Sequence, residues 1–364
     1  MKKTLIATTA LVAAGMLASP ASAAEKIKLG VSGFMENWVG FATQQSAFET
    51  GAGTAFESNY NDIDVQQDSE LTFSGSSKLD NGITVKAVLE IEADRGATGR
   101  DSVAVYLSSP SMGTVLIGAD KTPTWGMKKE APDVGIDRTD SDNWIVNPGS
   151  NSAQERPYVD GLSDAHKIGY KSPSFGGLQI GASYAPDSAT TQNGMTNMNT
   201  GAGSEYDVGA AYNGKFGGTS VGAALIWHGE ETQANNGDRD IITGGLSVSM
   251  SGITVGGAYT QISDDDGSVA GRTSTDGDFY NVGVSYKAGP TSVSLSYAHG
   301  EAEGLTSTAA DDERSVIMLS AGYNMGPGID MKASLFQAEY IDEAKTAALK
   351  NKGWGIVAGV DLAF

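Results

Sequence analysis

The segment Ile83-Thr84-Val85-Lys86-Ala87-Val88-Leu89-Glu90-Ile91-Glu92 alternates between apolar and polar side chains. Successive side chains of a β-strand point to opposite faces, so one face carries Ile83, Val85, Ala87, Leu89 and Ile91. The opposite face carries Thr84, Lys86, Glu90 and Glu92, and a dry core would strongly penalise the three charged groups. The segment therefore predicts a strand that has apolar surroundings on one side and water on the other.

The same alternation recurs along the rest of the chain. Each repeat of the pattern extends over about 10 residues, the length of one tilted membrane strand. Beyond residue 23 the sequence has no apolar run long enough for a transmembrane helix. Further alternating segments are Tyr206/Val208/Ala210/Tyr212, Val221/Ala223/Leu225/Trp227, Tyr280/Val282/Val284/Tyr286, Ser315/Ile317/Leu319/Ala321/Tyr323 and Trp354/Ile356/Ala358/Val360/Leu362/Phe364.

Short and long connections alternate between these segments. Seven short connections are rich in turn-forming residues, at 80–82, 110–113, 173–177, 213–218, 251–252, 287–290 and 324–328. Eight longer polar loops lie near 43–68, 94–100, 120–165, 186–204, 229–240, 263–277, 300–313 and 341–352. Such an arrangement predicts an all-β protein, a transmembrane barrel of about 16 antiparallel strands with both termini on the short-turn side.

Aromatic residues favour this barrel over a soluble β-sandwich, which shares the alternation. Tyr and Trp recur near the ends of the apolar faces, where a membrane barrel carries girdles of interfacial aromatic residues. The girdle positions predicted from the sequence are Tyr184, Tyr212, Trp227, Tyr286, Tyr323 and Trp354.

The amino terminus predicts export. Lys2 and Lys3, an uncharged apolar stretch and a small-residue exit ending at Ala23 are typical of a signal peptide over 1–23. The remainder, 24–364, is interpreted as a single domain. The chain has no cysteine, and removing the two lysines changes its formal net charge from −20 to −22. An acidic chain without clusters of Lys and Arg argues against a nucleic-acid partner.

The carboxy terminus introduces a family resemblance. Phe364 follows Leu362, Val360, Ala358, Ile356 and Trp354 at alternate positions. This ending resembles the assembly signal of bacterial outer-membrane proteins, which implies recognition of Phe364, Leu362 and Val360 by the barrel-assembly machinery. From 24 to 364 the chain resembles Gram-negative general-diffusion porins of the alphaproteobacterial type. The resemblance implies a 16-stranded barrel, a homotrimer, a multi-pass location in the cell outer membrane, and contact with its lipid and lipopolysaccharide.

A barrel of this size encloses a lumen that side chains alone do not fill. The longest loop, 120–165, is the third, and in the resembled porins the third long loop folds inward as a constriction. Rings of carboxylates favour cations in a narrow aqueous passage, so we expect a cation-preferring pore for small hydrophilic solutes. We place its acidic lip at Asp133, Asp137, Asp140 and Asp142, with Glu90 and Glu92 as lumen acids and a basic wall of Lys28, Lys78, Lys86, Arg95 and Arg100. Alternatively, these carboxylates only solvate the loop or pair with Arg138 and Arg156.

Other functions have weaker support. The acidic runs 264–266, 276–278 and 311–313 could bind Ca²⁺, but their spacing does not fit an EF-hand loop, so no cofactor is expected. An outer-membrane lipid hydrolase would need one of only three histidines, His166, His228 or His299, and no catalytic motif accompanies them. A substrate-specific porin needs a row of aromatic side chains, whereas the third loop offers only Trp125, Trp144 and Tyr158. An adhesin also remains an alternative.

Overall fold

The computed structural model describes residues 26–49, 60–93, 99–136, 141, 143–148, 165–187, 203–231, 238–264, 276–303, 311–343 and 349–364. In these residues the strands are β1 (Lys28–Thr43), β2 (Ile63–Lys78), β3 (Thr84–Glu92), β4 (Arg100–Ser109), β5 (Gly113–Ala119), β6 (His166–Lys171), β7 (Leu178–Ala185), β8 (Ser204–Phe216), β9 (Thr219–Glu231), β10 (Asp238–Met250), β11 (Ile253–Asp264), β12 (Gly277–Ala288), β13 (Thr291–Glu303), β14 (Asp311–Gly326), β15 (Ile329–Ile341) and β16 (Lys350–Ala363). The helical elements are α2 (Ser46–Glu49) and η1 (Trp125–Met127).

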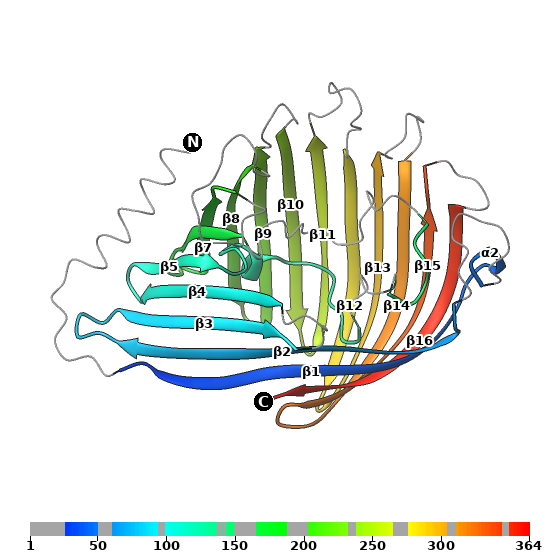
Figure 1. The fold of residues 1–364 in the computed structure, drawn as a ribbon, viewed down its shortest axis with the longest axis horizontal. Coiled ribbons are helices and arrows are strands. Elements are labelled where there is room, and N and C mark those ends of the chain that lie inside the picture. The colour runs from blue at the N-terminus through cyan, green and yellow to red at the C-terminus, as the bar shows by residue number, and fades with distance from the viewer. Residues whose placement is uncertain are drawn as a thin grey trace.

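Every strand pairs antiparallel with its neighbour along the chain, and β1 pairs with β16 to close the barrel. The closing register joins Phe34 to Ala363 and Thr43 to Trp354. In Figure 1, β1 to β4 run nearly at right angles to β9 to β12, as strands tilted by about 45° do on facing walls of a barrel. The predicted 16-stranded antiparallel barrel is confirmed.

The alternation of apolar and polar side chains is explained by the two faces of the barrel wall. Leu29, Val31, Leu225 and Leu246 are each more than 60% exposed on the outer surface, although they are strongly apolar. Such an exposed apolar band is costly in water and favourable in hydrocarbon. The intervening residues point into the barrel. No helix among the described residues is long and apolar enough to cross a membrane.

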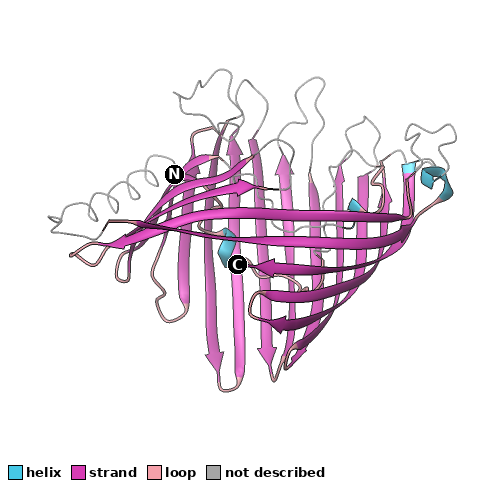
Figure 2. Cartoon of the chain, turned by 60° about the horizontal axis from the view of Figure 1, so that its bottom comes forward, coloured by secondary structure: helices cyan, strands magenta, loops and turns pink. Residues whose placement is uncertain are grey.

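The hairpin turns follow from their residues. Ser251 and Gly252 have φ angles of 51° and 83°, and two successive positive φ values characterise the type I′ turn that suits a two-residue hairpin. All seven predicted short turns join successive strands in the structure. Figure 2 shows short turns gathered at one end of the upright strands.

Two expectations about strand limits need correction. The first long loop was expected to reach residue 68, but β2 already begins at Ile63, which pairs with Phe41 of β1. Asp64, Gln66 and Asp68 made this segment resemble a loop, because they occupy the polar inner face of the strand. Strands were also expected to have about 10 residues, whereas β1, β2 and β14 each have 16.

Candidate functional site: a lumen lined by the third long loop

The third long loop turns into the barrel after β5. Beyond the single turn of η1, residues 128–136 continue along the inner wall, and residues 143–148 reach β1, β2 and β16. Two contacts hold the beginning of the loop: Thr124 donates a hydrogen bond to Asp207 of β8, and Tyr106 of β4 donates one to Asp120. The predicted inward path is therefore present in the described part of the loop.

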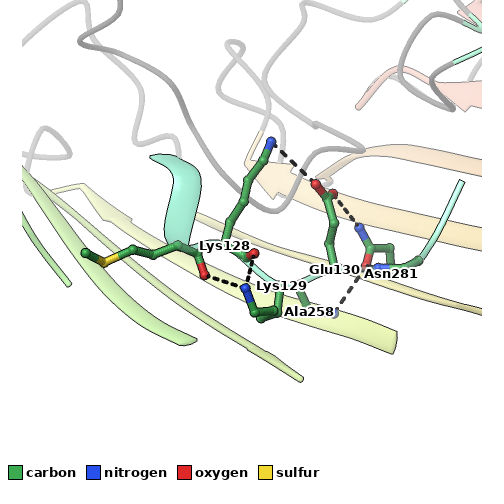
Figure 3. Close-up of polar contacts among 7 residues, drawn as sticks. Lys128, Lys129, Glu130, Ala258 and Asn281 are labelled. Atoms are coloured by element: carbon green, nitrogen blue, oxygen red, sulfur yellow. Dashed lines mark hydrogen bonds and ion pairs between the residues drawn. The ribbon is translucent and has the colours of Figure 1, made fainter. Parts of the chain in front are cut away.

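Asn281 of β12 is the central anchor of the loop (Figure 3). Its side chain is 3% exposed, and its Oδ1 accepts a hydrogen bond from the Ala131 backbone N–H at 2.8 Å. Its Nδ2 donates to Glu130 Oε2 at 3.4 Å. One amide thus satisfies both a loop backbone donor and a loop carboxylate, which buried polar groups require.

Serine hydroxyls continue this row of anchors. The Val134 N–H donates to Ser294 Oγ at 3.2 Å, and the Ile136 N–H donates to Ser334 Oγ at 3.1 Å. Ser320 Oγ donates to Asp133 Oδ1 at 3.2 Å. The wall therefore substitutes for the backbone partners that this irregular segment lacks.

The described loop residues Ser141 and Val146 are fixed near the closing strands. Asn351 of β16 is fully buried, and its Nδ2 donates to Val146 O and to Gln44 Oε1, both at 2.7 Å. Ser141 Oγ lies 2.6 Å from the Tyr340 hydroxyl of β15. These contacts attach the loop to both sides of the β1–β16 closure.

Glycine on the wall permits the close approach. A β-carbon at Gly256 of β11 would lie 2.6 Å from Glu130 O, and one at Gly135 of the loop would overlap Ser334 and Ser320. Both contacts are closer than real Cβ atoms allow, so a larger residue at Gly256 or Gly135 would push the wall and the loop apart.

The predicted acidic lip is only partly described. Asp133 lies beside β13 and β14, where Ser320 and Ser296 donate hydrogen bonds to its carboxylate. Asp137, Asp140 and Asp142 lie outside the described residues. The neighbouring acid of the loop is Glu130, which forms an ion pair with Lys128 at 3.4 Å.

The predicted basic wall occupies the short-turn end of β1 to β3. Lys28 and Lys86 both pair with Ser76 of β2, and Lys78 pairs with Thr84. All three lie on the inner face, because the apolar Leu29, Val85 and Ile83 occupy the alternate positions. Arg95 lies outside the described residues, and Arg100 is described only by its backbone in β4.

The predicted lumen acids lie further along the same wall. Thr72 Oγ1 donates to Glu90 at 3.4 Å, and Glu92 pairs across the strands with Glu70. Glu36 of β1 and Asp68 of β2 are also opposite each other in the strand register of this region. Acids and lysines on β1 to β3 thus lie at different heights along the strands. The predicted wall on β3 is also separated from Asp133, which lies beside β14, by the four strands β15, β16, β1 and β2.

Sequence reasoning assigned no role in the lumen to two lysines of the third loop, Lys128 and Lys129. Lys128 Nζ lies 3.5 Å from the centre of the Trp125 ring, within cation–π range. Lys129 Nζ donates to two backbone carbonyls, Met127 O and Lys128 O, at 3.3 Å each (Figure 3). Burial and the positive charge of Lys171 lower the pKa of Lys129. The position of the two loop lysines directly after η1, against the inner wall, could not be predicted from the sequence of the loop.

The predicted girdle residues occupy outward positions near the two ends of the strands. Tyr212, Tyr286 and Tyr323 lie toward the short turns, and Tyr184, Trp227 and Trp354 lie toward the long loops. Phe364 follows β16, and its backbone exchanges hydrogen bonds with Gly33 of β1 at 2.8 and 3.0 Å. The carboxy-terminal residue therefore takes part in barrel closure. Leu362 and Val360 pair with Met35 and Asn37.

The histidines and acidic runs were the residues behind the alternative functions. The side chains of His228 and His299 contact carboxylates, namely those of Glu205, Glu230 and Glu301. His166 begins β6. In the acidic runs, Asp278 accepts a hydrogen bond from Tyr259 and Asp312 accepts one from Glu343 N–H. Asp265 and Asp266 lie outside the described residues.

A closed 16-stranded barrel with an exposed apolar outer band and a polar interior narrowed by its own loop defines an outer-membrane channel protein. Comparison of the sequence with family models is consistent with this geometry, because residues 7–342 match the Gram-negative porin family. The chain belongs to that family, and its location is the bacterial outer membrane. No curated protein sequence matches it significantly.

Solved structures share the fold at low sequence identity. An anion-selective porin from Comamonas acidovorans superposes with a TM-score of 0.62 at 18% identity, covering 93% of this chain and 100% of the porin. An outer membrane protein of Vibrio cholerae, in a trimer form, gives 0.59 at 12% identity with the same coverage. A variant of the Rh. blastica porin gives 0.55 at 17%, again covering 93% and 100%. At these identities the similarity concerns the fold alone.

Proposed function

We propose that this porin passes small hydrophilic solutes and ions by passive diffusion through a cation-preferring, water-filled lumen. The observation that carries the proposal is the attachment of the described loop residues Thr124, Ala131, Ile136 and Val146 to the inner wall from β8 to β16. A loop held along the wall narrows a wide barrel and leaves its axis to water.

Cation preference is supported by the charge of the chain and of its lumen wall. The mature chain carries a formal −22 once Lys2 and Lys3 are removed from the total of −20. Glu36, Asp68, Glu70, Glu90 and Glu92 line the inner face of β1 to β3 toward the long loops. A passage with excess carboxylates lowers the energy of cations within it and raises that of anions.

Two lysines of the loop and one of the wall would add positive charge to the same lumen. Lys129 lies against Gly222 of β9, Lys128 precedes it in the loop, and Lys171 ends β6. Such separated charges would produce a field across the passage that orients dipolar solutes and disfavours apolar ones, which is the behaviour of a general filter. The Trp125 ring is in contact with Lys128, which weakens the case for an aromatic sugar track.

We further propose that the protein is exported by its signal peptide, 1–23, recognised through its carboxy terminus by the barrel-assembly machinery, and surrounded by lipid and lipopolysaccharide as a homotrimer. Recognition of the carboxy terminus would place β16 where β1 can pair with it during insertion into the membrane. Chemical cross-linking of membranes that contain the protein should yield a trimer band, whereas a single-chain band would contradict the homotrimer.

Reversal potentials in planar bilayers test the proposed selectivity. In a tenfold KCl gradient, the sign of the potential should correspond to K⁺ passing more easily than Cl⁻. A potential of the opposite sign would contradict cation preference, and absence of any conductance would contradict the channel itself. Liposome swelling with sugars of increasing size provides a second readout, because a general pore passes them without saturation.

A further inference from the structure

One buried cluster on the inner wall is not used by the proposed channel function. His228 of β9 is 4% exposed and Glu205 of β8 is 5% exposed. His228 Nε2 lies 3.3 Å from Glu230 Oε1 and 3.7 Å from Glu205 Oε2. Asp207 pairs directly with His228 across β8 and β9, and Arg239 of β10 lies 3.7 Å from Glu230.

We propose that Glu205, His228 and Glu230 form a binding site for a divalent transition-metal ion of the zinc class. One ligand atom from each residue can be chosen so that all three lie within 4.8 Å of one another. An imidazole and two carboxylates are a ligand set that Zn²⁺ uses, with the remaining position open to water. This inference does not depend on the selectivity proposed above.

The distances fit such an ion. With Zn–N and Zn–O bonds of about 2.0–2.2 Å, two ligands of a tetrahedral site lie roughly 3.3–3.5 Å apart. The observed separations of 3.3 and 3.7 Å are close to this value. The strand register explains the convergence, since Glu205 pairs with Glu230 and Asp207 with His228 in one continuous sheet.

Histidine distinguishes this cluster from the other acidic groups. Among the described residues, the remaining carboxylate clusters are Glu70 with Glu92 and Asp101, and Asp312 with Asp342 and Glu343. Both consist only of hard oxygen donors, whereas an imidazole ligand favours zinc and its neighbours among the transition metals. The cluster also adjoins the channel loop, because Asp207 accepts the hydrogen bond from Thr124.

His299 offers a matched control within the same chain. It lies two residues before Glu301 on β13, as His228 does before Glu230 on β9, and its Nε2 is 3.0 Å from Glu301 Oε1. No second carboxylate completes a three-ligand group there among the described residues. His299 and Glu301 face outward, so the pair reproduces the local sequence spacing without the site.

Metal binding should be measured directly on the folded, detergent-solubilised protein after chelator treatment. Calorimetric titration with Zn²⁺ should give one site per chain, and Co²⁺ should produce visible absorption typical of an imidazole-containing site of low coordination number. His228→Gln should weaken Zn²⁺ binding about tenfold or more. Even the loss of a residue that only hydrogen-bonds to a metal ligand lowers metal affinity by that factor, and His228 would be a ligand itself. His299→Gln should bind as the unaltered protein does.

Glu205→Gln gives an independent test if His228→Gln does not fold, and folding is checked by heat-dependent migration in detergent gels. Absence of Zn²⁺ binding by the folded unaltered protein would overturn the proposal. It would equally be overturned if His228→Gln, or Glu205→Gln in its place, bound Zn²⁺ with unchanged affinity. Because binding is measured without conductance, a negative result leaves the channel proposal untouched.

Discussion

Two regions of the inner wall differ in composition and in what covers them. Where the loop contacts β11 to β15, the inner face presents small side chains at Ala258, Asn281, Ser294, Ser320 and Ser334, and large apolar ones at Met318 and Phe336 beside Ile136. On β1 to β3 the inner face instead carries lysines and glutamates, namely Lys28, Lys86, Glu36, Glu90 and Glu92. The wall under the loop thus offers it hydrogen-bonding groups and apolar contacts, whereas the wall at β1 to β3 carries charges that water can solvate.

The largest effect is expected where the wall has no side chain at all. Gly256→Val places a β-carbon 2.6 Å from Glu130 O and overpacks the contact between loop and wall. Overpacking of this kind typically costs about 1–3 kcal/mol. We expect a lower folded yield and an altered single-channel conductance, because residues 130 and 131 must move toward the axis.

Gly244→Val is the matched control for this substitution. It lies on the outer face of β10, and its nearest neighbour for a new β-carbon is Leu225 Cδ1 at 3.9 Å. It should conduct as the unaltered protein does. Equal conductance changes in both variants would show that glycine content, rather than loop contact, determines the result.

Asn281→Ala should produce the next largest effect. The substitution removes the acceptor of the Ala131 N–H and the donor to Glu130. Leaving a buried donor without a partner costs about 1–3 kcal/mol. The loop should loosen, which predicts noisier open-channel current and faster hydrogen exchange at 130–132.

Asn324→Ala removes a comparable amide at the short-turn end, where Asn324 Nδ2 bonds only across to Asp330 on β15. It should leave both current noise and loop exchange unchanged. If the two variants behave alike, Asn281 is not an anchor.

Charge substitutions on the open wall should have a moderate effect of opposite sign. Glu90→Gln should shift selectivity toward anions, and Lys86→Gln should shift it toward cations, since both side chains face the lumen from β3. Reversal potentials measure both changes. The shifts should be smaller at 1 M than at 0.1 M salt, where the Debye length is about 10 Å. Shifts of the same sign would contradict the assignment of these charges to the passage.

The smallest effect is expected from the pH dependence of Lys129. Its pKa is lowered by burial and by Lys171, so the ammonium loses its charge as pH rises at a lower value than an ordinary lysine does. Cation selectivity should therefore increase as pH rises through this lowered pKa. Lys129→Gln should abolish that component, and an unchanged pH profile would show that Lys129 does not influence the passage.

The fold could be predicted from sequence because its determinants are local. Alternation in the segment from Ile83 to Glu92 and turn pairs such as Ser251-Gly252 need no distant partner, and they predicted both strand number and turn position. The start of β2 was missed, since Asp64, Gln66 and Asp68 carry no apolar signal on the inner face. Period-two reasoning works best where the opposite face is uniformly apolar.

The inward fold of the third loop followed from the family resemblance, but its attachment points on the wall could not be predicted, because its anchors are single polar residues far away in sequence. Asn281 lies 150 positions from Ala131, and Asn351 lies 205 positions from Val146. In the sequence, Asn281 and Asn351 are indistinguishable from other polar residues of the lumen face, because their contacts with the loop appear only in the folded chain. The convergence of Glu205, His228 and Glu230 was hidden for the same reason, since it depends on the register of β8 and β9.

A disulfide between loop and wall tests the central claim most directly, namely that the loop rests on the wall while the passage stays open. The chain has no cysteine of its own, so Ala131→Cys combined with Gly283→Cys adds a single pair, placed where a Gly283 β-carbon on β12 would lie 3.1 Å from Ala131 Cβ of the loop. The account predicts that the disulfide forms in the folded protein and that single-channel conductance is the same before and after reduction. Failure to form the disulfide, or a channel that opens only on reduction, would contradict it.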